Sequence, residues 1–125
     1  MSWLRATPEL LEVARSTLRD VVMPAVPPER RYEVAMAANA IGIAVRELRE
    51  GPAAREAERA DLAALLGGGP EATLDGLRRE LCRAIRAGDF PPEAETRLRE
   101  VLLAAVRRRL AISAPDQGGR GRTTP

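Results

Sequence analysis

Histidine and lysine are absent from this chain of 125 residues, and cysteine occurs once, at Cys82. Without histidine there is no imidazole general base, no Ser–His nucleophile pair and no histidine-ligated metal. Without lysine the chain has no Schiff-base amine and no P-loop lysine, because arginine stays protonated. A single cysteine forms no internal disulfide, and Cys82 beside an apolar stripe is expected to be a small core residue. We therefore expect no enzyme activity, no cofactor and no metal ion.

Aromatic residues are also scarce, since Trp3, Tyr32 and Phe90 account for only 2% of the chain. Alanine and leucine dominate instead, with 22 and 15 occurrences. Both are strong helix formers, whereas the β-branched residues that favour strands are few. The composition predicts an all-α fold with an aliphatic core in which alanine lets helices approach closely.

Long hydrophobic runs are missing too. No segment approaches the roughly 20 apolar residues that span a bilayer, and the first residues lack the pattern of a signal peptide. We therefore expect a cytoplasmic protein with no membrane partner. The 20 arginines are nearly balanced by 18 acidic residues, giving a net charge of +2. This balance gives little support to nucleic-acid binding, although the isoelectric point is about 9.4.

Proline and glycine divide the sequence into five helical segments. Thr7 and Pro8 form the start of the first, and Gly51–Pro52 is predicted to end the second, which covers residues 28–50. The third covers residues 52–66, and the fifth ends near Ser113. Short links between amphipathic helices predict a compact up-and-down bundle of four to five helices. Residues 1–115 are expected to form this single domain, and residues 116–125 a disordered tail rich in glycine and arginine.

The second segment carries the main candidate site. Tyr32, Asn39 and Arg46 are seven residues apart and share one helix face. Alanine and isoleucine surround Asn39 in sequence, so its amide is expected to be buried and to need a partner. That partner is either a neighbouring helix, in a purely structural role, or a ligand. Arg46 is placed to pair with Glu50, but pointing inward it could clamp a small anionic ligand.

The only local excess of positive charge is Arg107–Arg109, continued by Arg120 and Arg122 in the tail. Cations at a helix C-terminus are favoured by the helix dipole without any partner. Nucleic-acid binding normally adds stacking aromatic residues, and this segment has none. A nucleic-acid partner is therefore the least favoured of the alternatives.

Several short stretches resemble a family of small uncharacterised bacterial all-helical proteins. They are Ala37–Ala40, Arg46–Leu48 followed by Gly51–Pro52, Leu65–Gly67 and Ile85–Gly88. The resemblance covers about 110 residues in the same order. Members of the family occur alone, or fused to or near aminoglycoside-phosphotransferase-like kinases and acyl-CoA dehydrogenases. The resemblance implies an accessory domain for a kinase-like or acyl-CoA-handling partner, and it implies no catalytic residues.

Three functions remain open on these grounds. The first is a non-catalytic accessory or protein-interaction domain, with a protein partner that could be a second copy in a homodimer. The second is a helical module that binds a small anionic ligand through Tyr32, Asn39 and Arg46. The third is nucleic-acid binding through the C-terminal arginine cluster.

Overall fold

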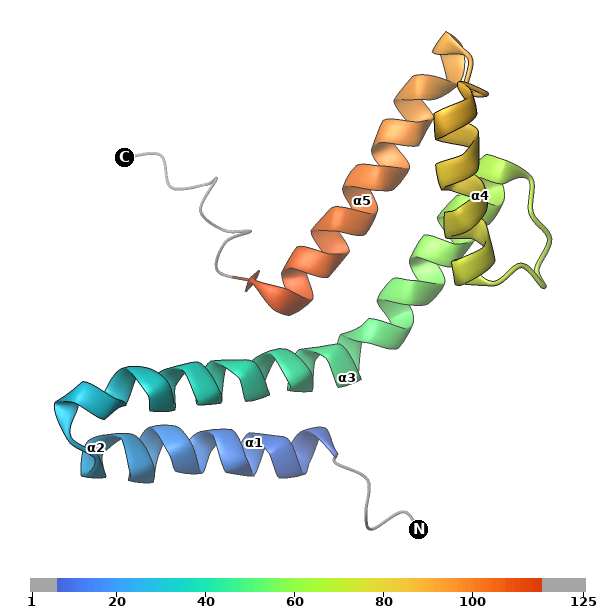
Figure 1. The fold of residues 1–125 in the computed structure, drawn as a ribbon. Coiled ribbons are helices and arrows are strands. Elements are labelled where there is room, and N and C mark those ends of the chain that lie inside the picture. Colours follow the sequence, from blue (N-terminus) through green and yellow to red (C-terminus); the bar gives the residue numbers. More distant parts are fainter. Residues whose placement is uncertain (1–6, 116–125) are drawn as a thin grey trace, which may run out of the picture. The chain divides into compact units, whose positions relative to one another are not determined.

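The structure, a computed structural model, describes residues 7–115, and every regular element in this range is helical. The predicted all-α fold is confirmed (Figure 1). The elements follow in the order α1 (Pro8–Thr17), a π-helical turn (Leu18–Val22), α2 (Met23–Ala25), a 3-10 turn (Pro28–Arg30), α3 (Arg31–Leu66), α4 (Leu74–Ala87), a second 3-10 turn (Pro92–Ala94) and α5 (Glu95–Ser113). The predicted tail, residues 116–125, lies outside the described residues.

Helix α3 runs without interruption through Gly51 and Pro52 for 36 residues, so the prediction that these two residues end a helix is wrong. A proline inside a helix removes one backbone hydrogen bond and strains the preceding turn, but it does not force the chain out of the helix. The folded chain separates into two compact units between Gly51 and Pro52. The weakened turn of α3 therefore coincides with the division between the units.

The first unit contains residues up to Gly51 together with Ile112–Ala114. Its main part is an antiparallel hairpin in which α1 and α2 lead into the first half of α3 (Figure 1). The buried seam of α3 has small side chains, because Ala38, Gly42 and Val45 are buried at spacings of four and three. A methyl group on Gly42 would already lie 3.5 Å from the Arg15 side chain of α1. The hairpin is thus closely packed, but few large side chains are buried in it.

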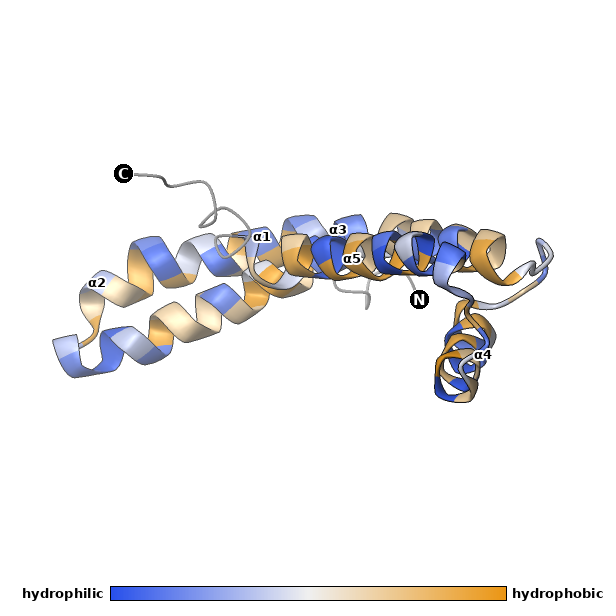
Figure 2. Cartoon of the chain, turned by 90° about the horizontal axis from the view of Figure 1, so that it is seen from above, coloured by the Kyte–Doolittle hydropathy of each residue, from blue (hydrophilic) through white to orange (hydrophobic). Residues whose placement is uncertain are grey.

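The second unit, residues 52–111, packs the second half of α3 with α4 and α5. Its core consists of Leu62, Leu77, Leu81 and Val101, each 6% exposed or less. These leucines and valines come from all three helices, and Phe90 and Leu98 pack against the cluster from the side. Hydrophobic and hydrophilic residues are both present around α4 (Figure 2), and Leu77, Leu81 and Ala84 form its buried side.

Local signals set the ends of these helices. Thr7 caps α1, because its hydroxyl accepts a hydrogen bond from the Leu10 N–H at 3.2 Å, as the sequence predicts. Thr73 caps α4 in the same way through the Gly76 N–H at 3.1 Å. Gly88 ends α4 with a φ of 70°, a left-handed conformation that glycine adopts without strain.

Two side chains of α4 differ from expectation. Cys82 is exposed, so it is not a core residue. Ile85 is apolar and yet 45% exposed, whereas Leu77, Leu81 and Ala84 of the same helix are buried. The reason is geometric: helix α4 turns about 100° per residue, so the side that meets α3 and α5 has room for only part of its apolar residues.

Substituting Leu62 with alanine should test the importance of the core of the second unit. Leu62 is 2% exposed, and a buried leucine-to-alanine change costs about 2–5 kcal/mol in free energy of unfolding. Ile85→Ala, at an exposed position of the same unit, should cost no more than about 1 kcal/mol. Chemical denaturation of both variants gives the comparison, and equal losses would show that this core is wrongly placed.

Candidate functional site

Tyr32, Asn39 and Arg46 all lie on the first half of α3, where the continuous helix keeps them on one side. Each is separated from the next by seven residues, or about 10 Å along the helix axis. Their side chains can act together only if the long tyrosine and arginine side chains turn toward Asn39. The structure shows a different arrangement.

Arg46 has a partner near the C-terminal end of α5. Its Nε–H donates to the carbonyl oxygen of Ile112 at 2.7 Å. The last carbonyls of α5 have no partner within their own helix and lie at the negative end of its dipole, so a guanidinium is well suited to them. Arg46 therefore caps α5, and the structure shows this bond in place of the predicted pair with Glu50.

Asn39 and Tyr32 are exposed, so the expectation of a buried amide at Asn39 is wrong. Tyr32 retains 73% of its accessible surface. The apolar sequence around Asn39 misled the prediction, because the buried seam of α3 follows Ala38 and Val45, and Asn39 lies just beside it. Two exposed side chains do not enclose a ligand together with Arg46, and binding of an anionic ligand here stays a prediction.

Two cavities lie elsewhere on the surface. One of about 340 Å³ is lined by Arg19, Met23, Pro24 and Arg31 near the hairpin turn. Another of about 360 Å³ follows the glycine-rich loop after α3 and includes Thr73 and Glu80. The linings of both exclude Tyr32, Asn39 and Arg46.

The arginines of α5 are divided between structure and surface. Arg108 donates to Asp61 of α3 at 2.9 Å, and its side chain is 31% exposed, so this member of the cluster is directed into the second unit. Its other terminal nitrogen, Nη1, is buried without a hydrogen-bond partner. Arg107 is exposed. The cluster is therefore not one continuous basic surface.

Ion pairs of the second unit account for the shifted pKa values. Hydrogen bonds from Arg59 lower the pKa of Glu56, and the same bonds raise the pKa of Arg59. Hydrogen bonds to Glu58 raise the pKa of Arg78, which meets that carboxylate at 2.6 and 2.8 Å. These pairs connect α3 internally and to α4, which is a structural role.

Metal binding and membrane insertion find no support within residues 7–115. This range contains no group of three or more cysteine, aspartate or glutamate side chains that could hold a metal ion. None of its helices is both long enough and apolar enough to cross a membrane.

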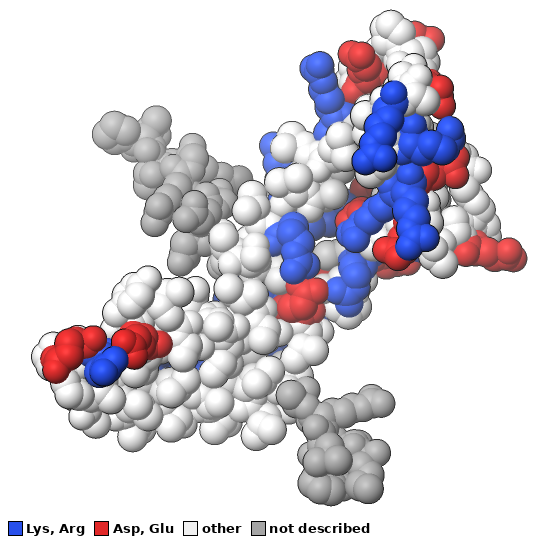
Figure 3. Space-filling model, viewed as in Figure 1, with Lys and Arg blue, Asp and Glu red and all other residues white. Residues whose placement is uncertain are grey.

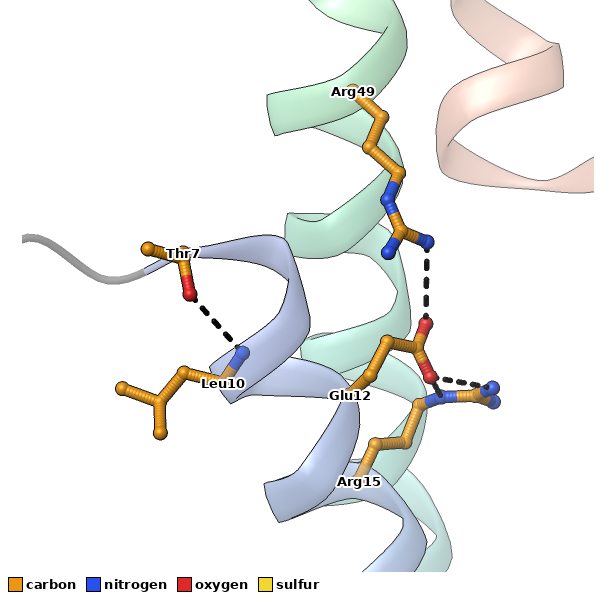
Figure 4. Close-up of polar contacts among 5 residues, drawn as sticks. All are labelled: Thr7, Leu10, Glu12, Arg15 and Arg49. Carbon is orange, nitrogen blue, oxygen red and sulfur yellow. Dashed lines mark hydrogen bonds and ion pairs between the residues drawn. The ribbon is translucent and has the colours of Figure 1, made fainter.

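The most distinctive surface of the first unit was not identified from the sequence. The two sides of the hairpin differ sharply in charge. On one side, which we call the polar edge, Glu12 of α1 contacts Arg15 at 3.2 Å and Arg49 of α3 at 3.8 Å (Figure 4). Leu10 points away from this edge. The polar edge thus fixes the rotation of α1 against α3.

The opposite side has no charged residue over most of its length (Figure 3). We call it the uncharged face. We assign to it the exposed uncharged residues that share one side of each helical segment by their spacing: Leu10, Val13, Ala14 and Thr17 of α1, Val21 of the π-helical turn, and Ala37, Ala44 and Leu48 of α3. The Thr17 hydroxyl donates to the Val13 carbonyl at 2.8 Å, so this polar group is satisfied internally. The signal for this face was present in the sequence, because the apolar residues of α1 cover more of the helix than one neighbour can bury.

Comparison with known proteins assigns a family. A family model described as a domain of unknown function, DUF6285, matches residues 24–117, about three quarters of the chain, so the chain belongs to this family. The match begins after α1. No curated protein matches the chain. No solved structure matches it either.

Removing the guanidinium of Arg46 should reveal what this residue does. Arg46→Met keeps the aliphatic part of the side chain but leaves the Ile112 carbonyl without its donor, at a cost of about 1–2 kcal/mol in unfolding free energy. Asn39→Ala changes an exposed side chain and should stay within about 0.5 kcal/mol of wild type. Denaturant titration measures both. A neutral Arg46→Met beside a destabilising Asn39→Ala would contradict the structural assignment.

Proposed function

We propose that this member of the DUF6285 family is a non-catalytic protein-interaction domain that forms a homodimer through the uncharged face of its first unit. The observation that carries the proposal is that face itself. Leu10, Val13 and Val21 are each more than 60% exposed, and their spacing places them on one side of the helical segment that α1 and the π-helical turn form. Exposed large apolar residues are common singly, but an extended apolar surface indicates an interaction site.

The length of the face suits a helical partner. From Leu10 to Val21 the stripe extends for about 16 Å along the helix axis. Ala37, Ala44 and Leu48 share one exposed side of α3, the helix that runs antiparallel to α1 (Figure 1), and we assign them to the same face. Small residues between larger ones leave grooves into which side chains of a facing helix fit.

A second copy of the chain is the occupant that the chemistry favours. Two hairpins that meet through this face would form a four-helix bundle, the usual way in which helix pairs bury a shared apolar side. In a twofold dimer the same patch meets itself, so like charges would face one another if it carried any. The residues assigned to the uncharged face carry none, and the exposed acids Glu9 and Asp20 lie at its border beside Val13.

An accessory role is the second part of the proposal. The resemblance to small bacterial helical proteins found beside kinases and acyl-CoA dehydrogenases supports a kinase-like or acyl-CoA-handling partner in the bacterial cytoplasm. The chain's chemistry is consistent with a supporting role, because it has no histidine or lysine to take part in such reactions itself. The partner would then act, and the helical dimer would bind or organise it.

A charged substitution in the uncharged face tests the dimer. The wild-type chain should sediment with about twice the monomer mass of 13.5 kDa at tens of micromolar. Val13→Asp should raise the dimer dissociation constant by about a hundredfold or more, because two unpaired carboxylates would be buried. Ala44→Asp on α3 should act in the same way.

The matched control is Ala60→Asp, which introduces the same charge at an exposed alanine of the second unit, outside the uncharged face. It should leave the mass unchanged, and circular dichroism should show that all three variants remain helical. A monomeric wild-type chain, or a Val13→Asp variant that keeps the double mass, would refute dimerisation through this face.

A further inference from the structure

Helix α5 presents a second apolar surface, on the side that faces away from the core of the second unit. We call it the α5 outer stripe. It consists of Leu102, Leu103, Val106 and Leu110, whose exposed fractions lie between 39% and 54%. The opposite side of the same helix is already used, since Val101 belongs to the core and Arg108 binds Asp61. One helix thus has two apolar sides, of which the second unit buries one.

Unpaired positive charge borders this stripe. Arg99 and Arg107 are exposed, and neither has an ion pair or hydrogen bond among the described residues. Glu100, the residue after Arg99, already forms an ion pair with Arg97, with 3.4 Å between Arg97 Nη1 and Glu100 Oε2. Most other arginines of residues 7–115, including those at the polar edge, do have a partner. Two free guanidiniums beside exposed leucines therefore distinguish this helix side from an ordinary solvated surface.

We infer that the α5 outer stripe docks an amphipathic helix of a different protein, one whose apolar side is bordered by aspartate or glutamate. Spacings of three and four between Leu103, Val106 and Leu110 match the anchor positions of a helix that lies along another helix. The acidic borders of the partner would meet Arg99 and Arg107. This inference rests on the proposed role as a protein-interaction domain and specifies the chemistry of its partner.

Charge decides against a second copy as the occupant of this stripe. Helix α5 has five arginines and two glutamates. Two copies of it packed together would bring Arg99 and Arg107 of both chains into one interface. The two glutamates of α5 would not balance this charge, because Glu100 is already paired with Arg97 and Glu95 lies in the first turn of the helix. Like charges in a closed interface are costly, whereas opposite charges favour association with the correct partner. A nucleic acid would satisfy the arginines but would leave the leucines in contact with water.

Two designed peptides of matched sequence test the inference. Each is a fluorescently labelled helix of about 20 residues with leucines on one side, bordered by glutamate in the first and by lysine in the second. Fluorescence anisotropy at low salt should show that the full chain binds the acidic peptide at least about tenfold more tightly than the basic one. Val106→Asp should abolish this binding.

Charge reversal supplies the specific readout. The double variant Arg99→Glu/Arg107→Glu should prefer the basic peptide, whereas Arg86→Glu on α4, also exposed and without an ion partner, should leave the preference unchanged. Equal binding of both peptides, no binding of either, or binding of a labelled duplex DNA in their place would overturn the inference. So would a Val106→Asp variant whose sedimentation mass falls, because this result would identify the stripe as a contact between copies.

The same measurements separate this inference from the proposed dimer. The Val13→Asp variant, if monomeric, should still bind the acidic peptide, because its α5 outer stripe is unchanged. A wild-type chain that is monomeric but binds the acidic peptide would show that only the uncharged face is wrongly assigned, and a dimeric wild-type chain that does not bind the peptide would show this only of the α5 outer stripe.

Discussion

A helix with a single neighbour can bury only one side, and this limit governs the first unit. Helix α1 packs against α3 (Figure 1), yet its apolar residues extend beyond the side that α3 covers, since Leu10 and Val13 are each more than 60% exposed. The second unit has three helix segments, and it encloses Leu62, Leu77, Leu81 and Val101 together. The first unit therefore leaves apolar side chains exposed that the second unit encloses. We attribute this difference to the number of helices that share the apolar surface in each unit.

Arginine provides the long-range polar contacts in both units. Arg46 reaches the Ile112 carbonyl, Arg108 reaches Asp61, and Arg78 reaches Glu58, each joining segments that are at least 20 residues apart. The planar guanidinium can donate several hydrogen bonds in fixed directions, which suits these positions better than a lysine ammonium would. Most basic residues of the described range thus stabilise the fold. The arginines without a partner, such as Arg99 and Arg107, are the ones available to bind another molecule.

The sequence was sufficient for the helical class and for the start of the first helix, because Thr7 and Pro8 act through local chemistry. It was insufficient at Pro52, where α3 stays helical against the local preference of the residue. The candidate site shows a related limit. Spacing alone placed Tyr32, Asn39 and Arg46 on one side of a helix, but which side is buried depends on where α1 lies. The partner of Arg46 is 66 residues away, and no local pattern indicates it.

Amide hydrogen exchange at several protein concentrations tests the central claim most directly. If a second copy covers the uncharged face, the amides of α1 gain protection as the concentration rises, because association stabilises the folded hairpin by mass action. Amides of α4, in the second unit, should exchange at rates that depend much less on concentration. Exchange in α1 that is equally fast at low and high concentration would contradict the claim that this chain completes its first unit with a second copy.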